Sequence, residues 1–133
     1  FNYDTDFILD NESKIALWVS KIIIDEDKKE GDINYIFCDD NYLHKINLEF
    51  LKHDTLTDII SFDYSVGKII QGDIYVSIDR VRENANDFKV DFSEELHRVI
   101  AHGVLHYCGY KDKTDLDTQV MRDKENHYLS VLG

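Results

Sequence analysis

Two histidines, His102 and His106, lie four residues apart in a segment whose pattern predicts a helix. At that spacing both imidazole rings project from one helix face, about one turn apart. This is the geometry with which two imidazoles bind one divalent metal ion, as in zinc sites of the HExxH class. Gly109 lets the chain turn back after the helix, and Asp112, six residues past His106, can bring a carboxylate to a third position. Three protein ligands with one position left for water are typical of a catalytic zinc site, in which the metal ion lowers the pKa of water toward ~7.

The residue that follows the first histidine restricts this chemistry. A peptidase of the HExxH type needs a glutamate there as general base, and this chain has Gly103. Peptidase chemistry by that route is therefore disfavoured. A histidine pair at this spacing is also compatible with an ordinary surface pair that binds no metal, and the spacing alone leaves both interpretations open.

The surrounding elements are predicted from periodicity, caps and turn residues. Apolar residues at helical spacing predict helices over residues 11–23, 39–50, 79–87, 91–107 and 115–132, with Ser13, Asp39 or Asp40, and Asp91 or Ser93 as caps. Runs of β-forming residues predict strands over 33–38, 59–64 and 68–78, the last two joined as an antiparallel hairpin through a turn at 65–67. The fold class is therefore α+β: a small mixed sheet of about four strands packed with about five helices, with the metal site on a central helix.

Composition narrows the class of protein. The chain has 133 residues, the size of one domain, so residues 1–133 are expected to form a single domain. Its formal charge of −12 disfavours a protein that coats nucleic acid or anionic membrane non-specifically. Apolar stretches are too short to span a bilayer and no secretory signal is present, which favours a soluble cytoplasmic protein. Cys38 and Cys108 are expected to be free thiols.

Three blocks carry a family resemblance, which covers nearly the whole chain. They are the run HGVLHYCGYKD at 102–112 with Met121 and Glu125 downstream; NLEFLKHD at 47–54 with TDIISF at 57–62; and GDIYVS at 72–77 followed by a helix containing Ala85. In this order and spacing the blocks resemble the YbeY family of ribosomal-RNA maturation factors.

The resemblance implies a zinc-dependent endoribonuclease that acts on single-stranded RNA. It implies work in the maturation of small-subunit ribosomal RNA, especially at its 3′ end, and in ribosome quality control. The expected partners are ribosomal RNA and the small ribosomal subunit with its proteins, without membrane or DNA. The family binds one zinc ion through three histidines, and these positions are His102, His106 and Asp112 here. The expected compartment is the cytoplasm.

The chain departs from the family pattern at two places. The family's Asp–His pair after the glycine turn appears as Lys111–Asp112, so an oxygen ligand stands in for the third imidazole and makes the site harder. Leu51 stands where the family commonly has arginine. A cation near the metal ion is the natural partner of a scissile phosphate, so Lys52 or His53 is the candidate replacement, with solvated loop residues as the alternative interpretation. The candidate catalytic residues are then the histidine pair with Lys52 and His53.

Other polar residues are weaker candidates. Asp58 and Ser61 flank a strand and are able to line the cleft. Glu95, seven residues before His102, shares its helical face and is able to orient a ligand, although an ordinary surface residue near the helix N-terminus is the stronger expectation. The remaining histidines are expected to be structural or surface residues and the tryptophan a core residue: His44, His97, His127 and Trp18.

Two other functions remain open at this point. One is a metal-dependent hydrolase of a substrate other than RNA, such as a peptide or a small ester. The other is a non-catalytic ribosome assembly factor in which the metal ion is structural. The replacements at Leu51 and Asp112 favour the assembly factor relative to a typical family member.

Overall fold

A computed structural model describes residues 1–51, 57–111 and 113–132. These residues form a four-stranded mixed sheet in the order β1-β2-β4-β3. The strands are β1 (Asn2–Tyr3), β2 (Lys29–Cys38), β3 (Ile59–Asp63) and β4 (Ile69–Ser77). β1 and β4 both run parallel to β2, whereas β3 pairs antiparallel with β4 at the sheet edge. The predicted α+β class and the predicted hairpin are confirmed.

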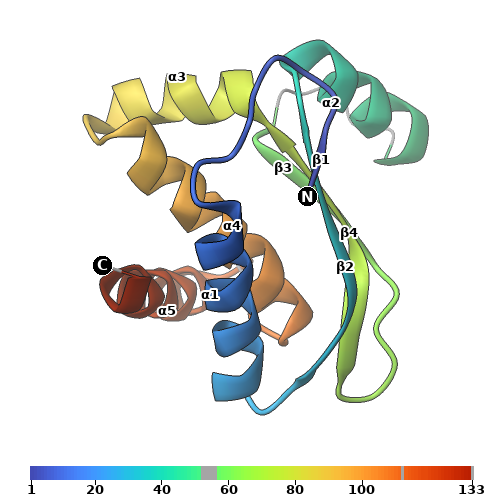
Figure 1. Ribbon diagram of the computed structural model, residues 1–133, viewed down its shortest axis with the longest axis vertical. Coiled ribbons are helices and arrows are strands. Elements are labelled where there is room, and N and C mark those ends of the chain that lie inside the picture. The colour runs from blue at the N-terminus through green and yellow to red at the C-terminus, as the bar shows by residue number, and fades with distance from the viewer. Residues whose placement is uncertain (52–56, 112, 133) are drawn as a thin grey trace.

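Helices cover the sheet unevenly. They are α1 (Glu12–Asp25), α2 (Asp40–Ile46) with the π-helical turn η1 (Asn47–Leu51), α3 (Ile78–Phe88), α4 (Phe92–Tyr107) and α5 (Asp115–Leu132). Figure 1 shows α1 and α4 on one side of the sheet, with α5 farther out, and α2 on the opposite side. α4 therefore lies centrally, between the sheet and α5.

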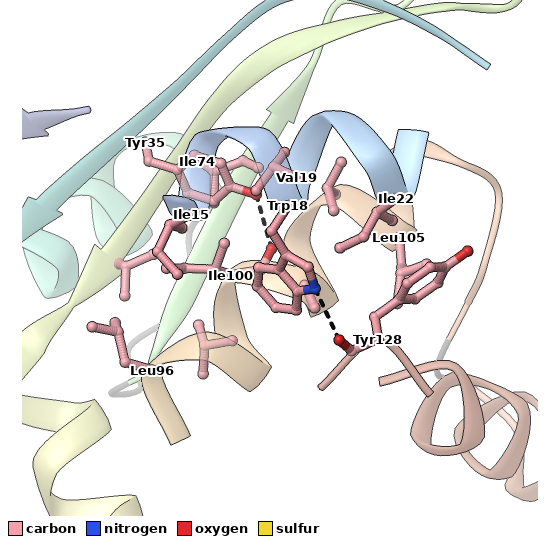
Figure 2. Close-up of a cluster of buried hydrophobic side chains, with 14 of the residues drawn as sticks. Ile15, Trp18, Val19, Ile22, Tyr35, Ile74, Leu96, Ile100, Leu105 and Tyr128 are labelled. Carbon is pink, nitrogen blue, oxygen red and sulfur yellow. Dashed lines mark hydrogen bonds between the residues drawn. The ribbon is translucent and has the colours of Figure 1, made fainter. Parts of the chain in front are cut away.

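The main core lies between the sheet and α1, α4 and α5. Trp18 of α1 is buried there, and its Nε1 donates a hydrogen bond to the carbonyl oxygen of Tyr128 at 2.8 Å (Figure 2). The hydroxyl of Tyr35 in β2 similarly donates to the Ile100 carbonyl at 2.8 Å. These buried polar groups are satisfied across elements, which ties α1 to α5 and the sheet to α4. The prediction that Trp18 is a core residue is confirmed.

Strand alternation assigns the two faces of β4. Ile70, Ile74 and Val76 join the main core, whereas Tyr75 points to the other face and packs with a smaller cluster under α2. Gly72 falls on the core face, where an added Cβ would lie 2.2 Å from the carbonyl oxygen of Phe62 and 2.6 Å from the hydroxyl of Tyr107. The close approach of α4 to the hairpin therefore requires glycine at this position.

Two local expectations about helix starts need correction. Asn11, in the left-handed region (φ 55°), occupies the N-cap position of α1 in place of Ser13, and its side chain makes no capping hydrogen bond. Asp91 occupies the N-cap position of α4 but its side chain makes no capping hydrogen bond. Asp39, by contrast, caps α2 as predicted by accepting from the backbone N–H of Tyr42 at 2.8 Å. The two-residue strand β1 was not predicted, because so short a run has no readable period.

The end of α4 sets the direction of the chain beyond the histidine pair. Gly109 has φ +109°, and its N–H donates to the His106 carbonyl at 3.0 Å. The Tyr110 N–H donates to the Leu105 carbonyl at 3.1 Å. Together these are the two hydrogen bonds of a Schellman motif, so Gly109 terminates the helix as the sequence predicts.

Two further expectations bear on the class of protein. Cys38 and Cys108 are free thiols, as predicted. Burial raises the pKa of Cys38 to about 12 and that of Cys108 to about 11. Of the helices in the described part of the chain, none combines the length and apolar character needed to cross a bilayer.

Candidate functional site

Two of the three predicted metal ligands, His102 and His106, lie side by side on α4. The Nε2 atoms of His102 and His106 lie 3.0 Å apart, and their rings are nearly perpendicular at 82°. Both side chains are half-buried, so they reach solvent through one opening. The four-residue spacing therefore brings the rings together as the sequence predicts.

Glu125 of α5 determines which nitrogen of His102 carries the proton. Its Oε2 accepts a hydrogen bond from Nδ1 of His102 at 2.7 Å. When Nδ1 carries the proton, the neutral ring has its lone pair on Nε2, the atom that faces His106. A carboxylate behind a ligating histidine is the usual arrangement around protein-bound metal ions. Glu125 thus selects the tautomer of His102 that is able to bind a cation.

Arg98 in turn holds that carboxylate, and a second arginine, Arg122, lies near it. Arg98 donates from Nη1 to Glu125 Oε1 at 3.0 Å and from Nη2 to Asn126 Oδ1 at 2.8 Å. Arg122 Nη1 lies 3.8 Å from the same Glu125 oxygen. Burial would raise the pKa of Glu125, but the hydrogen bonds from His102 and Arg98 outweigh it and lower this pKa. Glu125 is therefore held as a carboxylate although it is only 5% exposed.

The histidines open into a cleft of about 550 Å³. Its walls come from β3 and the segment before it and from three helices: Thr57, Asp58, Ile59 and Ser61; Asn84 and Phe88 of α3; Glu95, Arg98, Val99, His102 and His106 of α4; and Thr118, Met121, Arg122 and Glu125 of α5. Asp58 and Ser61 therefore line the cleft, as the sequence suggested.

Two carboxyl groups in the cleft have raised pKa values. Burial raises the pKa of Asp58, which accepts a 3.3 Å hydrogen bond from Nδ2 of Asn84. Burial and then the charge of Asp58 raise the pKa of Glu95. The expectation that Glu95 is an ordinary surface residue is wrong, because it is 5% exposed and faces the cleft one turn above Val99. Its burial depends on the elements packed around α4, and periodicity within α4 does not report that packing.

A side chain at position 103 would point into the interface between α4 and the sheet, not toward the histidines. An added Cβ there would lie 3.0 Å from Cδ1 of Ile59 and 3.1 Å from Cδ1 of Ile74, within the interface between α4 and the sheet. A glutamate at this position would enter the core rather than approach the histidines. The geometry therefore agrees with the sequence in disfavouring the peptidase mechanism.

The separation of the two histidine nitrogens fits two ligands of one zinc ion. Two nitrogens bound to a tetrahedral zinc ion, each at ~2.05 Å, lie about 3.3 Å apart, close to the separation of the two Nε2 atoms. Within residues 1–51, 57–111 and 113–132, no three His, Cys, Asp or Glu side chains are grouped so as to hold a metal ion. The predicted third ligand Asp112 and the candidate cations Lys52 and His53 lie outside the described residues.

A partly buried carboxylate at the end of α1, that of Glu26, anchors the described end of the turn after α4. Glu26 accepts hydrogen bonds from the hydroxyl of Tyr110 at 2.5 Å, from the hydroxyl of Tyr128 and from Nζ of Lys124 at 3.2 Å. Tyr110 is two residues before Asp112. This cluster therefore holds the described end of the turn against α1 and α5.

Sequence reasoning missed several residues of the cleft. Arg98 and Arg122 supply cations near the histidines, and Asn84 and Phe88 add an amide and an aromatic ring. Arg98 lies four residues before His102, a signal that was available. The other three come from α3 and α5, and local spacing carries no information about which face of those helices meets α4. His97 was predicted correctly: it packs edge-on against Trp18 at 6.1 Å.

Comparison with known proteins places this arrangement in a family. Endoribonuclease YbeY of Flavobacterium johnsoniae is 63% identical over 131 residues, which are 98% of this chain and 94% of that protein. Endoribonuclease YbeY of Christiangramia forsetii is 54% identical over 98% of this chain and 92% of its own length. The solution structure of TM1509 from Thermotoga maritima superimposes with a TM-score of 0.67 at 27% identity, covering 94% of this chain and 85% of that one. The family model for endoribonuclease YbeY matches residues 2–133. A histidine pair on a central helix, the α+β sheet around it and these similarities together show that the chain belongs to the YbeY family.

Proposed function

We propose that the protein is a zinc-dependent endoribonuclease that cuts single-stranded RNA during maturation of small-subunit ribosomal RNA, including its 3′ end, and in ribosome quality control. The single observation that carries the proposal is the convergence of His102 and His106 at the base of an open cleft, in a chain of the YbeY family. We place its work in the cytoplasm, on the small ribosomal subunit and its proteins.

The proposed ligands are His102, His106 and Asp112, for one zinc ion per chain. A bound zinc ion supplies Lewis acidity, which polarises a phosphoryl oxygen and activates water near neutral pH. The protein residues orient the ligands of that zinc ion. Glu125 holds the proton on Nδ1 of His102, and Arg98 holds Glu125.

A cation beside the histidines would hold the phosphate. Arg122 is half-exposed in the cleft wall, and its Nη1 lies at 3.8 Å from Glu125, too far for a good hydrogen bond. Its guanidinium is thus able to turn toward a phosphate oxygen and offset charge that develops there. Lys52 and His53 remain proposed for the same task. This chain has Leu51 where the family commonly has arginine, and Arg122 in the cleft wall is able to supply the cation instead.

The charge of the cleft favours a metal-dependent reaction. Two arginines, Arg98 and Arg122, oppose three carboxyl groups, those of Asp58, Glu95 and Glu125. With all three carboxyl groups ionised, this lining carries one net negative charge and does not attract an RNA phosphate. A zinc ion reverses that balance locally, while the charge of −12 over the whole chain weakens binding along an RNA backbone. We therefore propose weak affinity for isolated RNA, with targeting by ribosomal proteins.

The experiment measures zinc content and RNA cleavage on the same preparations. We expect about one zinc ion per wild-type chain and cleavage of a single-stranded RNA oligonucleotide that a chelator abolishes and added zinc restores. His102→Ala and His106→Ala should each lose most of the metal and the activity. His97→Ala is the matched control, because His97 lies on α4 but packs on Trp18. Unchanged zinc content in both site variants would overturn the metal assignment.

The same assay separates the two other functions. Cleavage of casein or of a small ester, without cleavage of RNA, would indicate a hydrolase of another substrate. Metal-loaded protein that binds immature small subunits but cuts no RNA would indicate a non-catalytic assembly factor. A duplex of the same oligonucleotide should resist cleavage if single strands are the substrate.

A further inference from the structure

The rim of the cleft carries an aromatic ring and an amide that neither metal binding nor phosphate binding uses. We propose that Phe88 and Asn84 form a nucleobase subsite, which stacks and hydrogen-bonds one unpaired base of the RNA next to the phosphate that is cut. This inference rests on the proposed function, because it assigns the substrate contacts of that same cleft.

The two side chains share one face of α3. They are four residues apart, one helical turn, and both line the cleft that contains His102. α3 leads into α4 through residues 89–91 (Figure 1). Phe88 is the last residue of α3, and Asn84 lies one turn before it. The ring and the amide are thus adjacent and belong to the histidine site.

The exposure of Phe88 has no structural explanation. Its side chain is 60% exposed, although Val81 and Ala85, which lie seven and three residues earlier on the same side of α3, are buried. An exposed ring at the edge of a polar cleft contributes little to the core. It does offer a flat apolar surface, and stacking on such a ring is the usual way in which proteins bind unpaired bases.

Asn84 supplies polar recognition beside that ring. Its Nδ2 donates to Oδ2 of Asp58 at 3.3 Å, which holds the amide in the cleft wall. With the amide oriented in this way, Oδ1 is able to accept from a base and the second Nδ2 hydrogen to donate to one. A nucleobase combines an apolar face with a polar edge, and this pair of side chains complements both.

The subsite also explains a preference for single strands. A base must leave its stack to lie on Phe88 with its edge toward Asn84, and this costs least when the base is unpaired. The neighbouring phosphate would then lie toward Arg122 and the histidines, which line the same cleft. Base binding thereby aligns the backbone, a task that the acidic protein surface performs poorly.

The test compares Phe88→Ala with Phe88→Tyr, and with Tyr64→Ala as a matched control. Tyr64 is also an exposed aromatic residue, 57% exposed, but it lies beyond the end of β3 and does not line the cleft. Single-turnover cleavage of a single-stranded RNA is measured as a function of enzyme concentration. Phe88→Ala should raise the enzyme concentration for half-maximal rate by roughly 5- to 150-fold. Phe88→Tyr and Tyr64→Ala should stay near wild type.

A second set of substrates locates the base. RNAs carry an abasic ribose at one position at a time around the cleavage site. For the wild type, one position should weaken binding by about the same factor as Phe88→Ala, and in Phe88→Ala that position should cause no further loss. Asn84→Ala should flatten the preference among the four bases at that position.

The outcomes separate this inference from the proposed function. If the wild type cuts RNA and Phe88→Ala binds it as Tyr64→Ala does, the subsite is wrong while the endoribonuclease stands. If every abasic position has the same effect in the wild type and in Phe88→Ala, the subsite is likewise wrong. If the wild type cuts no RNA, the proposed function itself fails. Because Phe88 is exposed, thermal unfolding of Phe88→Ala should match wild type, and a large drop would contradict its placement at the rim.

Discussion

Glu125 Oε2 lies 2.7 Å from His102 Nδ1, and this contact joins α5 to α4 across 23 positions of the chain. It leaves Nε2 of His102 facing Nε2 of His106 at 3.0 Å. The site is thus organised by the packing of two helices, and its properties should respond to residues that contact no ligand.

Glu125→Gln is expected to weaken zinc binding by about 10- to 100-fold, because the amide does not hold the proton on Nδ1 as a carboxylate does. Competition with a zinc-binding dye measures the affinity. Glu94→Gln is the control, since Glu94 is exposed on the first turn of α4. Equal zinc affinity in wild type and Glu125→Gln would show that this hydrogen bond does not orient a ligand.

Asp112→His should tighten zinc binding, and Asp112→Ala should weaken it, if residue 112 supplies the third ligand. Imidazole suits zinc better than a lone carboxylate oxygen, which also accepts magnesium and manganese. The measurement is the affinity of each variant for zinc and manganese; the preference for zinc should rise with histidine. Asp115→Ala, at the start of α5, is the comparison. If Asp112→His, Asp112→Ala and Asp115→Ala all bind zinc equally, residue 112 is not the third ligand.

Gly103→Glu should prevent stable folding, costing more than about 4 kcal/mol, because it places a charged side chain between α4 and the sheet. Gly103→Ala should change the free energy of unfolding by less than about 1 kcal/mol. Its Cβ would lie 3.0 Å from Cδ1 of Ile59 and 3.1 and 3.2 Å from Cδ1 and Cγ2 of Ile74, so these side chains must shift by a few tenths of an ångström. The higher helix propensity of alanine offsets that cost. Urea unfolding measures both. A folded Gly103→Glu with peptidase activity would contradict the orientation of this residue.

Glu26 should make the protein less stable in acid. Burial raises the pKa of Glu26, but hydrogen bonds from Tyr110, Tyr128 and Lys124 outweigh it and lower this pKa below its ordinary value of 4.5. The folded state thus binds the proton less readily than the unfolded chain. The stabilisation is present above pH 4.5 and is lost as the pH falls through the lowered pKa.

Urea unfolding at several pH values measures this contribution. Glu26→Gln should cost about 1–3 kcal/mol at neutral pH and show a shallower decline below pH 4.5. Tyr110→Phe should lose part of the same stabilisation, and Tyr64→Phe should lose none. A decline in Glu26→Gln as steep as in wild type would assign the acid sensitivity to other carboxylates.

Most of the elements follow from the sequence because their causes are local. Helical periodicity, the cap at Asp39 and the terminating Gly109 predict helices close to their observed bounds, and alternation along β3 and β4 predicts the hairpin. The start of the first helix was predicted to within one residue, but Ser13 was the wrong capping residue, because Asn11 occupies the N-cap position. β1 was missed, because it is too short for a pattern.

The sequence by itself determined the histidine pair, because a four-residue spacing on one helix fixes the relative position of two side chains. It also determined that Gly103 replaces the acid of a peptidase. Only the tertiary structure decided what surrounds the pair: Glu125 behind His102, Glu95 buried in the cleft, Arg122 in its wall and Phe88 at its rim. These residues belong to faces of three helices, and the angle and register at which helices dock depend on packing among residues far apart in the chain.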